Sequence, residues 1–283
     1  MAHFHLMHCI PDPRMHGLNG YKEVIETVRW GLEQLGHRAT YAINERAVDA
    51  TNIVFGAQVM PVAALAELGP GTIIYNFEQL RDVAVEQIRS EIRYYAGVPH
   101  FTIWDYSAAN LPSWRALKRH DVKIVPVGYA PILSRIPKAA HQDIDVLLYG
   151  LSGERRLQTF HGLSQLGLVT LFASGLYGAA RDELISRAKV VLNINLYAQM
   201  RIFEIVRVSY LLANRKAVVA DLDPKTSVED DIRGAVRFAS SLKELMDLCA
   251  KLVSDDSERH ALEERGFACM SRRDIKVILE RAL

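Results

Sequence analysis

The sequence predicts an α/β protein with two halves, each built on a parallel sheet. Short apolar runs alternate with amphipathic helical stretches along the chain, which is the pattern of strand–helix–strand units. The alternation is interrupted at residues 129–142, which hold two prolines and no periodicity and are typical of a linker. The 283 residues leave room for two small domains, at roughly 100–200 residues each.

In the first half, strands are predicted at residues 4–10, 39–43, 52–55, 72–77, 101–105 and 122–127, and helices at residues 21–35 and 83–95. The first helix carries Val24, Ile25, Val28 and Leu32 on one stripe, and Gly36 ends it. In the second half, strands are predicted at residues 145–149, 169–173, 190–196 and 217–221. Helices are predicted there at residues 156–166, 179–188, 201–213, 242–253, 258–269 and 274–283.

The composition indicates which partners the protein could bind and in which cellular compartment it is expected. The net charge of +1 gives no reason to expect nucleic acid. Three scattered cysteines predict neither a disulfide framework nor a metal knuckle, which favours the cytoplasm. Neither a signal peptide nor an apolar run of ~20 residues is evident. One basic run is either a solvated helix face or a peripheral contact with a phosphate or membrane surface: Arg115, Lys118, Arg119, His120 and Lys123.

Polar residues stand at the carboxyl ends of the predicted strands, where open parallel sheets bind their ligands. In the first half these include Glu78 and Asp105. In the second half, one group follows the strand at residues 145–149 and consists of Gly150, Ser152, Arg155 and Arg156. Another group belongs to the strand at residues 190–196, whose period of two would place its members on one face: Asn193, Asn195 and Tyr197.

The predicted helix at residues 201–213 is strongly apolar except for Arg201, Glu204 and Arg207. Spaced at i, i+3 and i+6, these three share a stripe of a helix that should be mostly buried. Buried charges must be paired or must meet a ligand. The stripe is therefore either an internal ion-pair ladder or part of a binding site.

Glycine loops open a helix in each half. Gly17, Asn19 and Gly20 precede the helix at residues 21–35, and Gly150 precedes the helix at residues 156–166. Amides at a helix start can hold a phosphate, although plain turns use glycine too. Neither loop has the dinucleotide or P-loop spacing. His16 lies beside the first loop as a candidate base or a plain surface residue, and no histidine cluster has metal-ligand spacing.

Several segments, in order along the chain, resemble GT-B glycosyltransferases. Residues 17–40, GLNGYKEVIETVRWGLEQLGHRAT, are similar to the opening of many members. Residues 124–129, IVPVGY, look like the end of the family's N-terminal lobe, and residues 146–150, VLLYG, like the start of its C-terminal lobe. Phe203 and Glu204, followed by the strand at residues 217–221, resemble the donor-site helix and the strand after it.

The resemblance implies two Rossmann-like lobes that face each other across a cleft. Residues 1–134 would form the acceptor lobe, residues 143–270 the donor-nucleotide lobe, and residues 271–283 a helix packing back on the first lobe. The activity implied is transfer of a sugar from a nucleotide-sugar to a hydroxyl of a glycan, lipid-linked or protein acceptor. The family generally needs no bound metal ion, and no cofactor besides the nucleotide-sugar co-substrate is expected.

The resemblance also implies roles for the polar residues. Glu204 would contact the donor's sugar or ribose, and Arg155 or Arg156 with Gly150 would face its diphosphate. Glu78, Asp105 or His16 would act as a base. The expected donor set is completed by Ser152, Asn193, Asn195, Tyr197, Arg201 and Arg207, and the expected acceptor or phosphate loop consists of Gly17, Asn19 and Gly20.

Two departures from the family pattern leave the chemistry open. The large retaining branch has two glutamates flanking seven residues, but here Leu212 stands eight positions after Glu204. The family's Gly-x-Pro before the last strand is replaced by NRKA at residues 214–217. Retention or inversion is not predicted. A nucleotide-sugar epimerase and a non-catalytic nucleotide-sugar or protein-binding module are the alternative functions.

Overall fold

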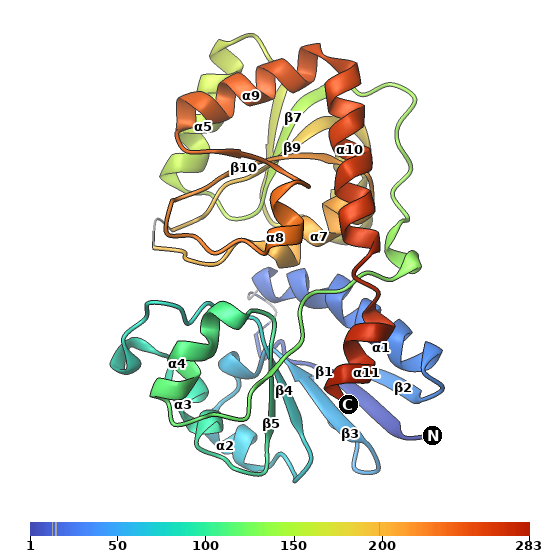
Figure 1. The fold of residues 1–283 in the computed structure, drawn as a ribbon, viewed down its shortest axis with the longest axis vertical. Helices are drawn as coiled ribbons and strands as arrows, with labels where there is room; N and C mark the ends of the chain where they lie inside the picture. Colours follow the sequence, from blue (N-terminus) through green and yellow to red (C-terminus); the bar gives the residue numbers. More distant parts are fainter. Residues whose placement is uncertain (13, 15, 198) are drawn as a thin grey trace. The chain divides into compact units, whose positions relative to one another are not determined.

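A computed structural model describes residues 1–12, 14, 16–197 and 199–283 (Figure 1). The chain divides into two compact units, which we call unit 1 (Met1–Ala130 and Asp274–Leu283) and unit 2 (Pro131–Arg273). Each unit contains a sheet whose strand pairs are all parallel. The predicted fold class, an α/β protein with two Rossmann-like halves, is confirmed.

The sheet of unit 1 has the order β2-β1-β3-β4-β5-β6. Its strands are β1 (His3–His8), β2 (Arg38–Ile43), β3 (Thr51–Phe55), β4 (Ile73–Asn76), β5 (Thr102–Asp105) and β6 (Lys123–Ile124). Its α-helices are α1 (Lys22–Gln34), α2 (Val62–Ala66), α3 (Ser90–Ala96), α4 (Leu111–Ala116) and α11 (Ile275–Ala282). Short 3-10 helices include η1 (His16–Tyr21), η2 (Ala57–Val59), η3 (Val85–Gln87) and η4 (Ala108–Asn110).

Helix α11 is remote in sequence from the rest of unit 1 but lies beside α1 (Figure 1). Gly31 makes the close approach possible, because a Cβ there would lie 2.8 Å from Leu279 Cδ1 and 3.0 Å from Ile275 Cγ2. The end of α11 is also fastened to the sheet, since Lys123 Nζ donates a 2.6 Å hydrogen bond to the carbonyl of Ala282. The last helix therefore completes the core of unit 1.

The sheet of unit 2 has the order β11-β10-β9-β7-β8. Its strands are β7 (Ile144–Tyr149), β8 (Thr170–Ala173), β9 (Ala188–Asn193), β10 (Ala217–Asp221) and β11 (Arg237–Ala239). Its α-helices are α5 (Glu154–Gln165), α6 (Gly178–Arg187), α7 (Ile205–Ala213), α8 (Asp230–Arg233), α9 (Leu242–Ser254) and α10 (Asp256–Ser271), and η5 (Pro131–Leu133) precedes them. One apolar core cluster joins β7, β9, β10 and β11 to α5, α9 and α10.

Both sheets have the same doubly wound order. Counted from the first strand of each unit, the order is second, first, third, fourth, fifth. The connections that leave the first and third strands diverge, and such a switch point opens a crevice at the carboxyl ends of those two strands. The crevice is expected beyond β1 and β3 in unit 1, and beyond β7 and β9 in unit 2.

Several predicted boundaries were wrong. The helix predicted at residues 201–213 begins at Ile205, because Phe203 N donates to Ser227 O at 3.0 Å and Ser227 N donates to Arg201 O at 2.7 Å. These backbone bonds hold residues 201–203 extended. The strand predicted at residues 190–196 ends at Asn193. The helix predicted at residues 83–95 is two shorter pieces, η3 and α3, and β11, α2, α4 and α8 were not predicted.

Candidate functional site

In unit 2, two arginines converge on the glycine that follows β7. Gly150 has φ of +120°, a conformation that residues with a side chain rarely adopt. A Cβ at Gly150 would lie 3.0 Å from Arg207 Nη2 and 3.2 Å from Arg156 Nη1. Glycine at this position therefore allows both the positive φ and the close approach of the two guanidinium groups. We call Gly150, Arg156 and Arg207 the Gly150 site, and it stands at the switch point of this sheet.

Arg156 fixes the loops around the Gly150 site. It is 4% exposed, and its guanidinium donates to the carbonyl of Ile194 at 2.9 and 2.6 Å and to the carbonyl of Leu151 at 2.7 Å. Burial and the neighbouring Arg207 lower the pKa of Arg156 to about 10, and Glu204 and Asp221 oppose that shift. With its donors turned to backbone carbonyls, Arg156 orders the ends of β7 and β9.

Arg207 is only partly buried and has donors to spare. Its Nη1 donates to the carbonyl of Tyr149 at 3.2 Å, and its guanidinium lies over the Tyr149 ring, 5.2 Å from the centroid. Across the described part of the chain, no carboxylate lies within 4.0 Å of this guanidinium. A guanidinium without an ion pair, next to a second one, favours an anion.

The start of α5 adds to this positive environment. Gly153 is the N-cap and provides no side-chain cap, so the first amides of this 12-residue helix have no partner from the helix itself. Such amides and the helix dipole attract phosphate oxygens. Arg155, in the first turn, pairs with Asp221 at 3.0 Å. The Asp221 carboxyl also accepts from Asn195 N at 2.9 Å, and burial raises the pKa of this carboxyl.

The other predicted donor residues lie around the same sheet edge. Glu204 is the N-cap residue of α7 and partly buried, and its backbone lies one turn before Arg207, whose N–H donates to the Glu204 carbonyl at 3.2 Å. Arg201 lies in the extended segment before α7, so the predicted helical stripe of Arg201, Glu204 and Arg207 was wrong. Ser152 is exposed in the loop before α5.

Asn193 is the last residue of β9, at the switch point. It is fully buried, and neither its Nδ2 nor its Oδ1 has a hydrogen-bond partner among the described residues. Asn195 and Tyr197 follow the strand and are 7% and 56% exposed. The prediction that these three side chains share one strand face was wrong, because the strand stops before the second of them.

In unit 1, Asp105 is the centre of a buried polar network at the end of β5. Its Oδ2 accepts from Trp114 Nε1 at 2.6 Å and from Asn76 Nδ2 at 2.8 Å. Asn110 Nδ2 donates to both carboxylate oxygens, and Ser107 N donates to Oδ1 at 2.8 Å. Asp105 is fully buried, and burial raises the pKa of its carboxyl to about 6 against the opposing effect of these donors. A carboxylate so enclosed is placed to order its neighbours.

Glu78 is ordered by that network and is itself partly exposed. Its carbonyl accepts from Asn76 Nδ2 at 3.0 Å and from Asn110 Nδ2 at 2.9 Å. Its carboxylate accepts from Gln58 Nε2 at 2.9 Å, and the same Nε2 lies 3.1 Å from the hydroxyl of Tyr21. The supporting residues Asn76, Gln58 and Trp114 were not predicted from the sequence. The strand-end rule would have found Asn76, but no local signal marks the other two.

The predicted glycine loop of unit 1 is itself a 3-10 helix. Gly17, Asn19 and Gly20 lie in η1, directly before α1, and a Cβ at either glycine would have no atom of the described residues within 4 Å. The carbonyl of Leu18 is 2.9 Å from His8 Nε2, which ties η1 to β1. The backbone of His16 begins η1, while its side chain lies outside what the structure describes.

The described residues offer neither a metal-binding cluster nor a membrane-spanning helix. No group of three or more histidine, cysteine, aspartate or glutamate side chains there could hold a metal ion. None of the helices within those residues has both the length and the apolar character that a membrane span requires.

The two doubly wound α/β units of this chain make up a GT-B fold, which solved structures of glycosyltransferases share. No protein-family model matches the sequence, and no curated protein matches it significantly. The likeness to known proteins is therefore one of structure.

Solved glycosyltransferase structures match along nearly the whole chain. AviGT4, a glycosyltransferase involved in avilamycin A biosynthesis, superposes with a TM-score of 0.60 at 14% identity, over 100% of this chain and 96% of that one. Anabaena Alr3699/HepE in complex with UDP and glucose gives a TM-score of 0.63 at 11% identity, over 99% and 97%. T4 phage BGT in complex with UDP-glucose gives 0.57 at 13% identity, over 100% and 98%.

Proposed function

We propose that this protein transfers a sugar from a nucleotide-sugar to an acceptor hydroxyl, and that unit 2 holds the donor's diphosphate at the Gly150 site. The convergence of Arg156 and Arg207 on Gly150 carries the proposal, because two adjacent guanidinium groups are stabilised by a bound anion. The first amides of α5, which have no hydrogen-bond partner in the part of the chain that the structure describes, would add hydrogen bonds to phosphate oxygens. Structures with the same fold contain UDP or UDP-glucose, which supports this choice of anion.

In the proposed reaction, negative charge grows on the diphosphate as the bond to the sugar breaks. Arg207 and the α5 amides are placed to stabilise that charge, and this supports a reaction that needs no metal ion. Glu204, one turn from Arg207, would accept hydrogen bonds from hydroxyls of the donor's sugar or ribose. Arg156 would keep the two strand ends in position.

Unit 1 would supply the acceptor site and a base. We propose Glu78 as the base, since the residue is partly exposed and its carboxylate is oriented by Gln58. A base must come within hydrogen-bond reach of the hydroxyl that it deprotonates. Asp105 would act as a positioning residue, because the network around it holds the backbone of Glu78.

The test is release of nucleoside diphosphate from a panel of nucleotide-sugars, measured with EDTA present and with and without candidate acceptors. At least one donor should be hydrolysed slowly alone and faster with an acceptor. Arg207→Ala should reduce the rate at least tenfold, whereas Arg233→Ala, an exposed residue of unit 2 paired with Asp230, should not. A sugar epimerised without release of diphosphate, or no turnover of any donor, would reject the proposal.

A further inference from the structure

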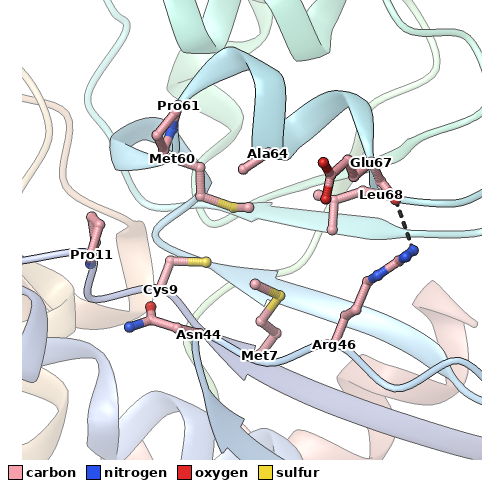
Figure 2. A pocket seen from close by; sticks show the side chains of 10 residues that line it. All are labelled: Met7, Cys9, Pro11, Asn44, Arg46, Met60, Pro61, Ala64, Glu67 and Leu68. Carbon is pink, nitrogen blue, oxygen red and sulfur yellow. Dashed lines mark hydrogen bonds between the residues drawn. The ribbon is translucent and has the colours of Figure 1, made fainter.

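Unit 1 contains a pocket of about 380 Å³ that the proposed transfer reaction does not use (Figure 2). It lies between the end of β1, the loop after β2, and the segment of η2 and α2. Its volume falls within the roughly 300–1,000 Å³ of small-molecule sites. The end of β1 is also one side of the switch point of this sheet, the place where open α/β sheets bind ligands.

The inner wall of the pocket is apolar and rich in sulfur. Met7, Cys9, Met60 and Leu68 form it, each at most 6% exposed, and Figure 2 shows the three sulfur side chains turned toward the same space. Burial raises the pKa of the Cys9 thiol to about 12, so this side chain is neutral and adds no charge to the wall. Methionine side chains are flexible and polarizable and adapt to apolar ligands of varied shape.

The rim of the pocket carries the Arg46 guanidinium, which can donate further hydrogen bonds. Arg46 donates from Nη1 to the carbonyl of Glu67 at 2.8 Å, and it makes no ion pair with any residue that the structure describes. Arg46 is exposed, and its guanidinium makes no other hydrogen bond with the residues that the structure describes, so its remaining N–H groups are available to oxygen atoms of a ligand. The carboxylate of Glu67 is exposed on the same rim and would weaken, without cancelling, the attraction for an anion.

The pocket is held open by its surroundings. Asn44 clamps the loop after β1, since its Oδ1 accepts from Ile10 N at 2.7 Å and its Nδ2 donates to Ile10 O at 2.8 Å. On the other side, Gly56 lies so near Cys9 that a Cβ there would be 2.9 Å from the Cys9 carbonyl oxygen. Arg46 fastens the end of α2. A preformed pocket binds its ligand without first having to order these loops.

We propose that this pocket binds a small amphiphile, namely an alkyl chain that carries a carboxylate or phosphate group. The chain would lie against Met7, Met60 and Leu68, and the anionic group would pair with Arg46. Binding of an amphiphile in this pocket would not require glycosyl transfer.

Methionine methyl NMR tests the proposal directly. The chain has 7 methionines, so ¹³C-methyl labelling gives a simple spectrum in which Met7→Leu and Met60→Leu assign the two pocket signals. Titration with decanoate or decyl phosphate should shift those two signals saturably. Binding of either anion supports the proposal, and the tighter one identifies the head group. Arg46→Ala should weaken the anion's binding about tenfold but leave 1-decanol unchanged, and Glu67→Gln should tighten binding of the anion.

A pair of α2 variants separates pocket binding from non-specific binding. Ala64 lines the pocket and Ala63, its neighbour on the helix, is exposed. Ala64→Trp should fill the pocket and abolish the shifts, whereas Ala63→Trp should leave them. The proposal fails if neither anion shifts the two signals at millimolar concentration, if Ala64→Trp still binds, or if Arg46→Ala binds decanoate as well as the wild type does.

Discussion

The Arg207 guanidinium lies against Gly150 so closely that a Cβ on that glycine would come within 3.0 Å of Arg207 Nη2. The contact joins the end of β7 to the first turn of α7, two elements more than 50 residues apart. Gly150 also has φ of +120°. The backbone conformation at this position and the approach of the Arg207 charge therefore both require a glycine.

Gly150→Ala tests this dependence. The added methyl group should strain the backbone by about 1–3 kcal/mol and push Arg207 aside. The chain should fold, with a reduced melting temperature, and lose at least tenfold in affinity for a nucleoside diphosphate. Gly175→Ala is the matched control, since Gly175 has φ of +72° in open space. It should lose stability but keep its affinity, and equal affinity loss in both variants would argue against the contact.

Asp105→Asn should destabilise unit 1. An amide nitrogen in place of either carboxylate oxygen would face the N–H groups of Trp114, Asn76 or Ser107, so buried donors would lose their acceptor. The expected loss is about 3 kcal/mol or more in the free energy of unfolding, measured by chemical denaturation. Asp82→Asn is the control, because Asp82 is exposed at φ of +60°, which asparagine tolerates, and it should change the free energy little.

We expect Lys216 to make the stability of unit 2 depend on pH. It is 1% exposed, and burial lowers the pKa of its ammonium from 10.5 to about 8, against the opposing effect of Glu263. The unfolded chain therefore binds this proton more tightly than the folded chain does. The contribution of Lys216 to the free energy of unfolding is therefore highest above pH 10.5. It decreases by about 3 kcal/mol as the pH falls toward 8.

Lys216→Met removes that titration while roughly keeping the side-chain volume. The free energy of unfolding of the variant minus that of the wild type should be about 3 kcal/mol higher at pH 7 than at pH 10.5. Urea denaturation at both pH values measures this difference. The comparison cancels other groups that titrate in both proteins. The same difference at both pH values would show that Lys216 is not responsible.

The packing of α11 on α1 depends on the absence of a side chain at Gly31. Gly31→Val should cost about 1–3 kcal/mol, because its methyl groups would collide with Leu279 and Ile275. Truncation of the partner in the double variant Gly31→Val/Leu279→Ala should recover part of that cost, measured as a coupling free energy. Strictly additive losses would contradict the contact.

The sequence predicted most of the alternating elements, because apolar periodicity is a local signal. It failed where a distant segment decides the conformation. Residues 201–203 were predicted to be helical from their apolar pattern, but backbone hydrogen bonds with Ser227 hold them extended. Asn195 and Tyr197 were predicted to continue a strand that stops at Asn193, and the pair of Asn193 with Ala220 is the last in the register of β9 with β10.

The candidate site was predictable only in outline. The rule that ligands bind at strand ends drew attention to Gly150, Arg156 and Asn193, and the structure places them at the switch point of one sheet. The φ of Gly150 and its contact with Arg207 depend on packing between β7 and α7, which no local pattern records. Trp114 likewise reaches Asp105 only because α4 folds back on β5.

Isothermal titration of nucleoside diphosphates, with EDTA present, tests most directly whether unit 2 holds a donor diphosphate at the Gly150 site. At least one of UDP, GDP, ADP and CDP should bind saturably to the wild type. Arg207→Ala should bind it at least tenfold more weakly, and Arg233→Ala should bind it unchanged. The account is contradicted if none of the four binds at millimolar concentration, or if Arg207→Ala binds as tightly as the wild type.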